Sequence, residues 1–388
     1  MGLATFDPDQ AARELLSLAR GQWANGMVPH IIFGPAEDHW EGPDFWRSRE
    51  VEGAPAAVDT SAVTQPPVVT IAAEVVGSRL APAERERFLR AIHPMLVRHH
   101  TWMYGERVRE SGLVVVVHPW ETGLDTSPPW MELFARRRRP LDKAVHRGDT
   151  LVVPLEERPT DVEAAETAAL AETYRGWGYD SQTILDRSPI VVESLDFNAI
   201  LVQANESLRR IAGEVGEPIQ ADLLAAMGRT AAALETLWDD ARQEYFSRDH
   251  RRGELVAESS VAAFMPLFAG TATPSRARAL LAKLHDPASY GARFPVPSAP
   301  IGSAYFSDRR YWQGPTWINM NWFIIEGLAR CSFDEEADRL LATTLDLVGS
   351  NGFREYYSPL TGEGFGAHRF SWTAALTLDL VARSERSA

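Results

Sequence analysis

The sequence is poor in cysteine, in long apolar runs and in basic charge, and each shortage excludes a class of protein. One of its 388 residues is a cysteine, Cys331, so no disulfide can form within the chain, which suits a reducing compartment. No stretch approaches the roughly 18 consecutive apolar residues of a transmembrane helix. The N-terminus lacks the basic and apolar regions of a secretory signal. We therefore expect a cytoplasmic protein with no membrane partner.

Basic charge is scarce relative to acidic charge. Lys and Arg total 39 against 53 Asp and Glu, a formal net charge of −14. Because phosphate backbones are bound by basic surfaces, we expect no nucleic-acid partner, and the run Arg136–Arg139 is typical of a solvated helix end. The ten histidines are scattered, and the sequence has no P-loop, GxSxG or dinucleotide-binding motif. We expect neither a metal nor an organic cofactor.

Helical patterns dominate what is present. Apolar residues recur at spacings of three and four, and several segments open with a capping residue or with proline. Strand signals are few and short, at Leu113–His118 and Leu151–Val153. Since no stretch has the composition of a flexible linker, we predict one all-α domain over residues 1–388. The expected helices are 8–20, 66–78, 82–106, 128–138, 159–175, 195–214, 218–245, 259–269, 273–285, 316–330, 334–350 and 371–385.

Tryptophan and aromatic loops give the first indication of function. The chain has 12 tryptophans, and indole is a rigid platform for the flat C–H faces of a sugar ring, although tryptophans that fill a large core account for the number equally well. Three long stretches rich in proline and glycine, 42–67, 287–302 and 351–367, carry or border several aromatic residues. Long irregular loops in a compact domain are usually functional or disordered. We interpret these loops as the walls of a site.

Two carboxyl residues stand in unusual surroundings. Asp125 follows an apolar run and lies between Trp120 and Trp130, which would raise its pKa. Glu355 lies among Phe353 and two tyrosines. Glycoside hydrolysis uses two carboxyl groups, one protonated and one ionised. From the residues alone, a helix-capping Asp125 and an exposed loop Glu355 remain the favoured alternatives.

Six segments together carry a family resemblance. In order along the chain, they resemble glycoside hydrolase family 63, especially its small bacterial mannosylglycerate and glucosylglycerate hydrolases, over about residues 22–380. The resemblance implies an (α/α)6 barrel with a cap of long loops, loop insertions near 21–67, 139–190 and 287–315 that shape the pocket, and no cofactor. The segments are Asn25–His30, Gly42–Asp44, Thr64–Pro67, Thr122–Pro128, Tyr311–Asn319 and Phe353–Tyr357.

The same resemblance assigns roles to single residues. It implies that Asp125 is the general acid and Glu355 the general base of an inverting reaction on α-linked glucose or mannose. We expect the sugar to contact tryptophans and polar side chains, with Arg107 facing an anionic aglycone such as glycerate. Core packing remains a substantial alternative for each residue. The other expected binding residues are Trp23, Trp40, Asp44, Gln65, Tyr104, Tyr311, Trp312, Trp317 and Tyr356.

The acid-bearing turn departs from the family pattern. The family commonly has Asp-Asn-Ser-Pro-Arg-Trp, whereas this chain has Thr126 and Pro129 in place of the Asn and the Arg. The loss of those donors keeps open a catalytically impaired carbohydrate-binding protein. It also leaves the substrate undecided among glucosylglycerate, mannosylglycerate and a glucose-capped oligosaccharide. A lyase or epimerase is disfavoured, because no His or Tyr stands in a comparable segment. A homo-oligomer is compatible with the sequence.

Overall fold

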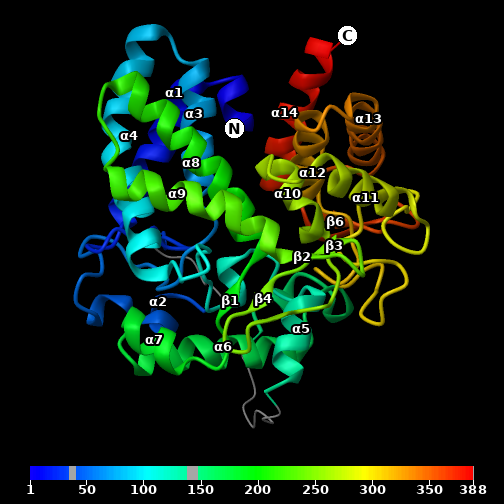
Figure 1. The fold of residues 1–388 in the computed structure, drawn as a ribbon, viewed down its shortest axis with the longest axis horizontal. Coiled ribbons are helices and arrows are strands. Elements are labelled where there is room, and N and C mark those ends of the chain that lie inside the picture. The colour runs from blue at the N-terminus through cyan, green and yellow to red at the C-terminus, as the bar shows by residue number, and fades with distance from the viewer. Residues whose placement is uncertain (35–40, 138–146, 388) are drawn as a thin grey trace.

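The computed structural model describes residues 1–34, 41–137 and 147–387, and most of them are helical (Figure 1). No helix within these ranges is both long and apolar enough to cross a membrane. The α-helices are α1 (Pro8–Ser17), α2 (Pro43–Trp46), α3 (Val68–Arg79), α4 (Pro82–Trp102), α5 (Pro128–Ala135), α6 (Asp161–Gly176), α7 (Ser181–Arg187), α8 (Leu195–Val215), α9 (Ala221–Ala233), α10 (Met265–Ala269), α11 (Pro274–His285), α12 (Ile318–Arg330), α13 (Asp334–Asn351) and α14 (Ser371–Ser387).

An inner ring of helices forms the body of the protein. Helix α3 packs against α8, α8 against α10, α10 against α12, and α12 against α14. The 3-10 turn Gly2–Thr5 and α1 close the ring between α14 and α3. A Cβ atom at Gly2 would lie 2.0 Å from the backbone oxygen of Ala375, so this closure requires glycine. Helices α4, α9 and α13 pack outside the ring.

The ring helices direct their N-terminal ends toward one region. First-turn residues of five of them, Val68, Asp196, Met265, Asn319 and Trp372, line a single cavity. In Figure 1 the two halves of the ring stand side by side, with α2, α5, α6 and α7 below them. Residues outside the ring helices, among them Gln65, Asp125 and Glu355, line the same cavity.

Short antiparallel strands stiffen these connecting segments. Strands β1 (Val192–Glu193), β4 (Arg248–Asp249) and β5 (Glu254–Leu255) form one small sheet, and β2 (Trp238–Asp239) pairs with β3 (Glu244–Tyr245). Strands β6 (Arg354–Tyr357) and β7 (Gly364–His368) form a hairpin whose register shifts between Arg354 and Tyr356. Glu355 stands at that shift.

Two clusters of buried apolar side chains make up the core. One lies among the helices of the N-terminal half and includes Trp46, Leu96 and Tyr174. The other lies among α8 and α10–α14 and includes Phe268 and Trp312. The core thus lines both halves of the ring.

The expected helices are largely confirmed. The helix expected over 218–245 is α-helical only as far as Ala233 and continues as a 3-10 turn, Leu234–Leu237. Beyond it, the Asp239 carboxylate accepts bonds from the backbone N–H groups of Ala241 and Arg242 and fixes a turn between β2 and β3. The strand expected at Leu151–Val153 is wrong: a 3-10 turn spans Asp149–Leu151.

The strand expected at Leu113–His118 makes only isolated bridges, and the insertion expected over 139–190 is largely helical in its described part. The single domain over 1–388 stays a prediction.

Candidate active site

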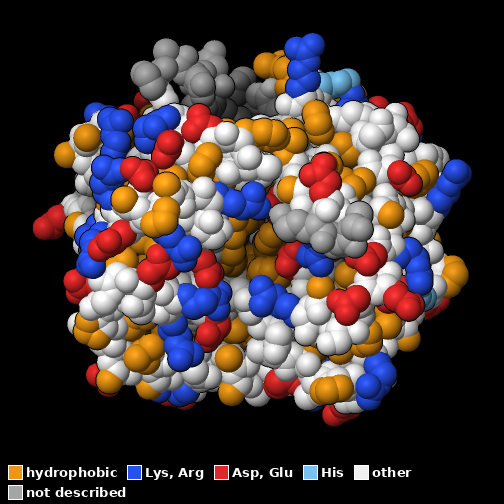
Figure 2. Space-filling model, turned by 90° about the horizontal axis from the view of Figure 1, so that it is seen from above, with side chains coloured by type: hydrophobic (Ala, Val, Ile, Leu, Met, Phe, Trp, Pro, Cys, Tyr) orange, Lys and Arg blue, Asp and Glu red, His pale blue; other side chains and the backbone are white. Residues whose placement is uncertain are grey.

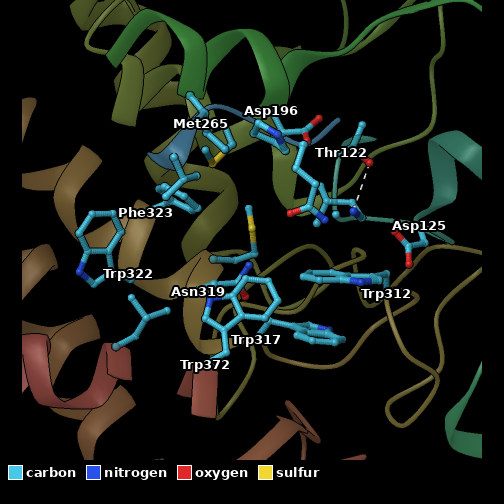
Figure 3. A pocket seen from close by; sticks show the side chains of 18 of the residues that line it. Thr122, Asp125, Asp196, Met265, Trp312, Trp317, Asn319, Trp322, Phe323 and Trp372 are labelled. Atoms are coloured by element: carbon cyan, nitrogen blue, oxygen red, sulfur yellow. Dashed lines mark hydrogen bonds between the residues drawn. The ribbon is translucent and has the colours of Figure 1, made fainter. Parts of the chain in front are cut away.

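A cavity of about 450 Å³ lies where the N-terminal ends of the ring helices meet the connecting loops. Its volume is within the roughly 300–1,000 Å³ typical of small-molecule sites. The molecule is hollowed near the middle of the face in Figure 2, with hydrophobic side chains on the walls of the hollow. Figure 3 shows side chains from ring helices and from loops around the cavity. Asp125 and Glu355, far apart in sequence, both line it.

Asp125 lies in the turn before α5. The Thr122 hydroxyl fixes this turn by accepting bonds from the Leu124 N–H at 3.1 Å and from the Trp130 indole N–H at 3.2 Å. Asp125 keeps part of its surface open to the cavity, but desolvation by the atoms packed around it raises its pKa to about 7. The Tyr311 hydroxyl donates to Oδ2 at 3.4 Å and opposes this rise. This carboxyl can therefore hold a proton near neutral pH.

Glu355 is buried on β6, where three donors engage its carboxyl group. The two Nη atoms of Arg158 donate to its two oxygens, each at 2.9 Å, and the Ala367 N–H donates to Oε2 at 2.8 Å. A Cβ at Gly366 would lie 2.5 Å from Oε2, so the hairpin closes over this carboxyl group only because glycine stands there. Paired bonds between a guanidinium and a carboxyl group fix the orientation of both groups.

Tyr311 connects the two carboxyl groups. Its hydroxyl bonds Asp125, while the guanidinium of Arg158, which holds Glu355, lies 5.4 Å from its ring centre. Its backbone has φ of 39°, an uncommon value for a residue other than glycine. Strained conformations of this kind persist where the surrounding structure enforces them, and they cluster at functional sites.

Aromatic side chains form one wall of the cavity. The rings of Trp312 and Trp317 stack with centres 3.9 Å apart and planes 5° apart. The Trp317 N–H donates to the Tyr311 carbonyl at 3.0 Å, and Tyr356 packs on Trp317 with ring centres 4.6 Å apart. Trp372, 42% exposed, stands 6.3 Å from Trp317. Flat aromatic faces suit the apolar face of a sugar.

Of the predicted site residues, the structure brings six to this cavity: Asp125, Glu355, Gln65, Tyr311, Trp312 and Trp317. Tyr356 packs behind Trp317, and its hydroxyl donates to the Glu157 carbonyl. Asp44 is exposed on α2. Trp40 lies outside the described residues.

Three predicted binding residues lie elsewhere. Trp23 and Arg107 line a separate cavity of about 870 Å³. Arg107 is buried and ion-paired with the buried Glu121 at 3.2 Å, so its guanidinium is already engaged and does not suit the expected anionic aglycone. Tyr104 is buried against Thr230 and Asn205. Trp23 donates to Thr60 and packs edge-on against Tyr179. None of the three lines the cavity that holds Asp125 and Glu355, which corrects their expected place in the site.

Sequence reasoning missed several residues that the structure brings to the site. Arg158 follows a 3-10 turn in a segment expected to be helical from residue 159, and nothing in its spacing pointed to Glu355. Asp196 resembles an ordinary first-turn acid of α8. Trp372, in the aromatic segment Phe370–Thr373, was not named among the expected binding residues. Glu41 does not line the cavity but interacts electrostatically with Asp125: desolvation, followed by the charge of Asp125, raises the pKa of Glu41 to about 9.

Comparisons with known proteins agree with this geometry. Residues 1–373 match the family described as mannosylglycerate hydrolase MGH1-like glycoside hydrolase domain. The chain is 40% identical to a mannosylglycerate hydrolase of Thermus thermophilus over 97% of this chain and 91% of that one. It is 31% identical to the glucosylglycerate hydrolase of Mycolicibacterium hassiacum over 98% and 89%.

Among solved structures, the family 63 mannosylglycerate hydrolase from a second strain of Thermus thermophilus, in complex with Tris, matches with a TM-score of 0.91, 38% identity, and coverage of 98% of this chain and 91% of that one. The same enzyme in complex with Tris and D-glycerate matches with a TM-score of 0.89. The predicted (α/α)6 barrel is confirmed by this likeness.

The fold and the similarities define a glycoside hydrolase. The chain belongs to the MGH1-like glycoside hydrolases of family 63.

Proposed function

We propose that this protein hydrolyses an α-glucoside or α-mannoside of glycerate with inversion at the anomeric carbon. Its relatives are named for mannosylglycerate and glucosylglycerate, and one was crystallised with D-glycerate. Helices α3, α8, α12 and α14 direct the positive ends of their dipoles at the cavity, which favours an anionic ligand in a chain of net charge −14.

Asp125 is the general acid in this proposal. Its pKa of about 7 leaves a large share of the carboxyl protonated at neutral pH, as proton donation to the leaving glycerate oxygen requires. The Tyr311 hydroxyl orients Oδ2, and after proton transfer it stabilises the carboxylate that forms.

Glu355 is the general base. A carboxylate has about four lone-pair positions, and three of those on Glu355 accept bonds from Arg158 and Ala367. The remaining position, on Oε1, accepts a bond from the attacking water and then its proton. An inverting reaction needs room for this water, so we expect roughly 6.5–9.5 Å between the two carboxyl groups. A separation near 5 Å would favour retention instead.

The observation that carries the proposal is the contrast between two carboxyl groups on one cavity. Desolvation raises the pKa of Asp125 to about 7, whereas Glu355 is ion-paired with Arg158. Trp312 and Trp317 supply a flat surface for the sugar, and Gln65 supplies an amide for its hydroxyls. Cytoplasmic location stays a prediction from the sequence.

The test is hydrolysis followed by proton NMR. Wild type and Asp125→Asn are incubated with α-glucosylglycerate, α-mannosylglycerate and simple α-glucosides and α-mannosides. We expect the β-anomer to appear first from a glycerate conjugate with the wild type, and no such signal from the variant. Immediate appearance of the α-anomer would contradict inversion. Absence of turnover on the whole panel would contradict the enzymatic proposal and favour a sugar-binding protein.

A further inference from the structure

Two polar side chains on the cavity wall have no part in the mechanism above. Asp196 is the second residue of α8, and Asn319 is the second residue of α12. Both line the cavity, with 5% and 7% of their surfaces exposed. Figure 3 shows them on facing sides of it, with Trp317 beside Asn319.

Each of these side chains carries a buried oxygen that no described protein group bonds. They are Oδ2 of Asp196 and Oδ1 of Asn319, whereas Oδ1 of Asp196 accepts a bond from the Ser194 hydroxyl. Burying such an atom without a partner destabilises the fold, so buried polar atoms in proteins are normally bonded. Two unbonded oxygens on one cavity therefore point to a ligand that donates to them.

The surroundings define the class of ligand. In Figure 3 the labelled side chains near Asp196 are Met265 and Thr122, Trp317 lies near Asn319, and Phe323 lies between these two sides; none of the four offers a carboxylate or carbonyl ligand from its side chain. A hard cation would need six or more oxygen ligands, so this wall does not suit one. Two acceptors set in an apolar and aromatic wall suit the hydroxyl groups of a sugar ring. Desolvation raises the pKa of Asp196 to about 6, so the carboxylate, an acceptor at both oxygens, prevails at neutral pH.

We infer that Asp196 and Asn319 form a hydroxyl-binding subsite that selects the hexose of the substrate. The inference rests on the proposed function in taking the ligand to be the sugar part of a glycoside. The unbonded oxygens lie just beneath the cavity surface, so binding includes a side-chain rotation, a common change when a ligand binds. Asp125 and Glu355 act at the anomeric carbon, and the subsite holds hydroxyls elsewhere on the ring.

A purely structural role for Asp196 is the competing explanation. An acidic residue in the first turn stabilises a helix by interacting with its dipole. The chain offers a matched control in Asp222, the second residue of α9, which is exposed and does not line the cavity. Asp196→Asn and Asp222→Asn remove the same charge from the same helix position. They differ in whether the residue faces the cavity.

The test is titration of the full-length protein with free hexoses. D-glucose, D-mannose and the 2-, 3-, 4- and 6-deoxy derivatives of glucose are added to wild type, Asp196→Asn, Asn319→Ala and Asp222→Asn, and dissociation constants are measured by calorimetry or NMR. We expect Asp196→Asn and Asn319→Ala to bind the preferred hexose roughly 10- to 100-fold more weakly, and Asp222→Asn to bind it like wild type. At least one deoxy sugar should bind wild type more weakly than glucose does. For Asp196→Asn, the affinities for that deoxy sugar and for glucose should differ little, because the variant has already lost the bond to the missing hydroxyl.

Two results would overturn the subsite. One is wild-type affinity for every hexose in both Asp196→Asn and Asn319→Ala; the other is no binding of any hexose by wild type. If Asp196→Asn does not fold, Asn319→Ala and the deoxy series with wild type decide the question. These titrations need no turnover, so their outcome is independent of the hydrolysis test. Hydrolysis with unchanged sugar preference in both variants would overturn the subsite and leave the proposed function standing.

Discussion

The two carboxyl groups of the cavity are held by opposite means. Around Asp125, packed protein atoms withhold solvent, and one hydroxyl donates to the carboxyl at 3.4 Å. Around Glu355, a guanidinium and a backbone N–H supply three bonds of 2.8–2.9 Å. The first environment disfavours the charged form of Asp125, and the second supplies donors to both oxygens of Glu355. The proposed division into acid and base rests on this difference in donors between the two walls of one cavity.

The largest effect on turnover is expected from removing either carboxyl group. Asp125→Asn and Glu355→Gln should each lower kcat by roughly 10²- to 10⁴-fold. The two variants should differ on a glycosyl fluoride, whose leaving group needs little protonation. Activity of Asp125→Asn should recover with this substrate, whereas Glu355→Gln should stay slow. Equal recovery by both variants would contradict the division of roles.

The pH dependence tests the state of Asp125 directly. Because the acid must be protonated, kcat/KM should fall about tenfold per pH unit above roughly pH 7, the value to which desolvation raises its pKa. If kcat/KM instead began to fall near pH 5, the result would contradict the environment described for Asp125.

The pH dependence of thermal stability is an independent test of the raised pKa of Asp125. In the unfolded chain an aspartate ionises near pH 4, so between about pH 4 and pH 7 the folded state retains a proton that the unfolded state has released. Asp125 therefore stabilises the fold less as pH rises through this window. The Tm of Asp125→Asn minus that of wild type should increase from pH 4 to pH 7 and stay constant above pH 7. Asp222→Asn, the exposed control, should show no such change.

Removing the donor at the other wall should have a smaller effect. Arg158→Leu leaves Glu355 with a single backbone donor, and we expect kcat/KM to fall roughly 10- to 100-fold. Arg158→Lys keeps the charge but not the paired geometry, so it should recover only part of the rate. An unchanged kcat/KM in Arg158→Leu would mean that Arg158 does not maintain the base.

The smallest effect on turnover is expected at Arg107. Its partner Glu121 is buried and accepts a bond from the Val117 N–H at 2.7 Å, and neither residue lines the cavity that holds Asp125 and Glu355. Arg107→Met should leave KM for a glycerate conjugate unchanged but lower stability by about 3–5 kcal/mol, since it strands a buried carboxylate. Kinetics beside thermal or urea unfolding separate the two effects. A raised KM without loss of stability would restore the anion-binding role first expected for this residue.

Local sequence signals predict the helices well and the long-range contacts poorly. Helical spacing and capping residues located α3, α8, α12 and α13 to within a few residues, because those signals act over one or two turns. The helix expected through residue 245 fails where Asp239 forms a side-chain turn. Helix propensity does not take account of such a bond from a side chain to the backbone.

The site residues show the same difference between local signals and long-range contacts. The carboxyl groups and the Tyr311–Trp317 segment could be placed because neighbouring residues make a recognisable motif. The ion pair between Arg158 and Glu355 joins residues 197 positions apart, and only the folded ring brings them together. Arg107 and Tyr104 have suitable chemistry for a sugar site, but the face of α4 and its extension on which they lie decides their partners. Residue type alone therefore predicted more binding residues than the fold brings to the cavity.

The position of Tyr311 has a consequence for the stereochemistry of the proposed reaction. Its hydroxyl bonds Asp125, and the guanidinium of Arg158, which pairs with Glu355, lies over its ring. In the mechanism proposed above, this rigid ring on a constrained backbone is a spacer between the acid and the base. A shorter side chain at position 311 would therefore change the room left for the attacking water, and with it the anomer released.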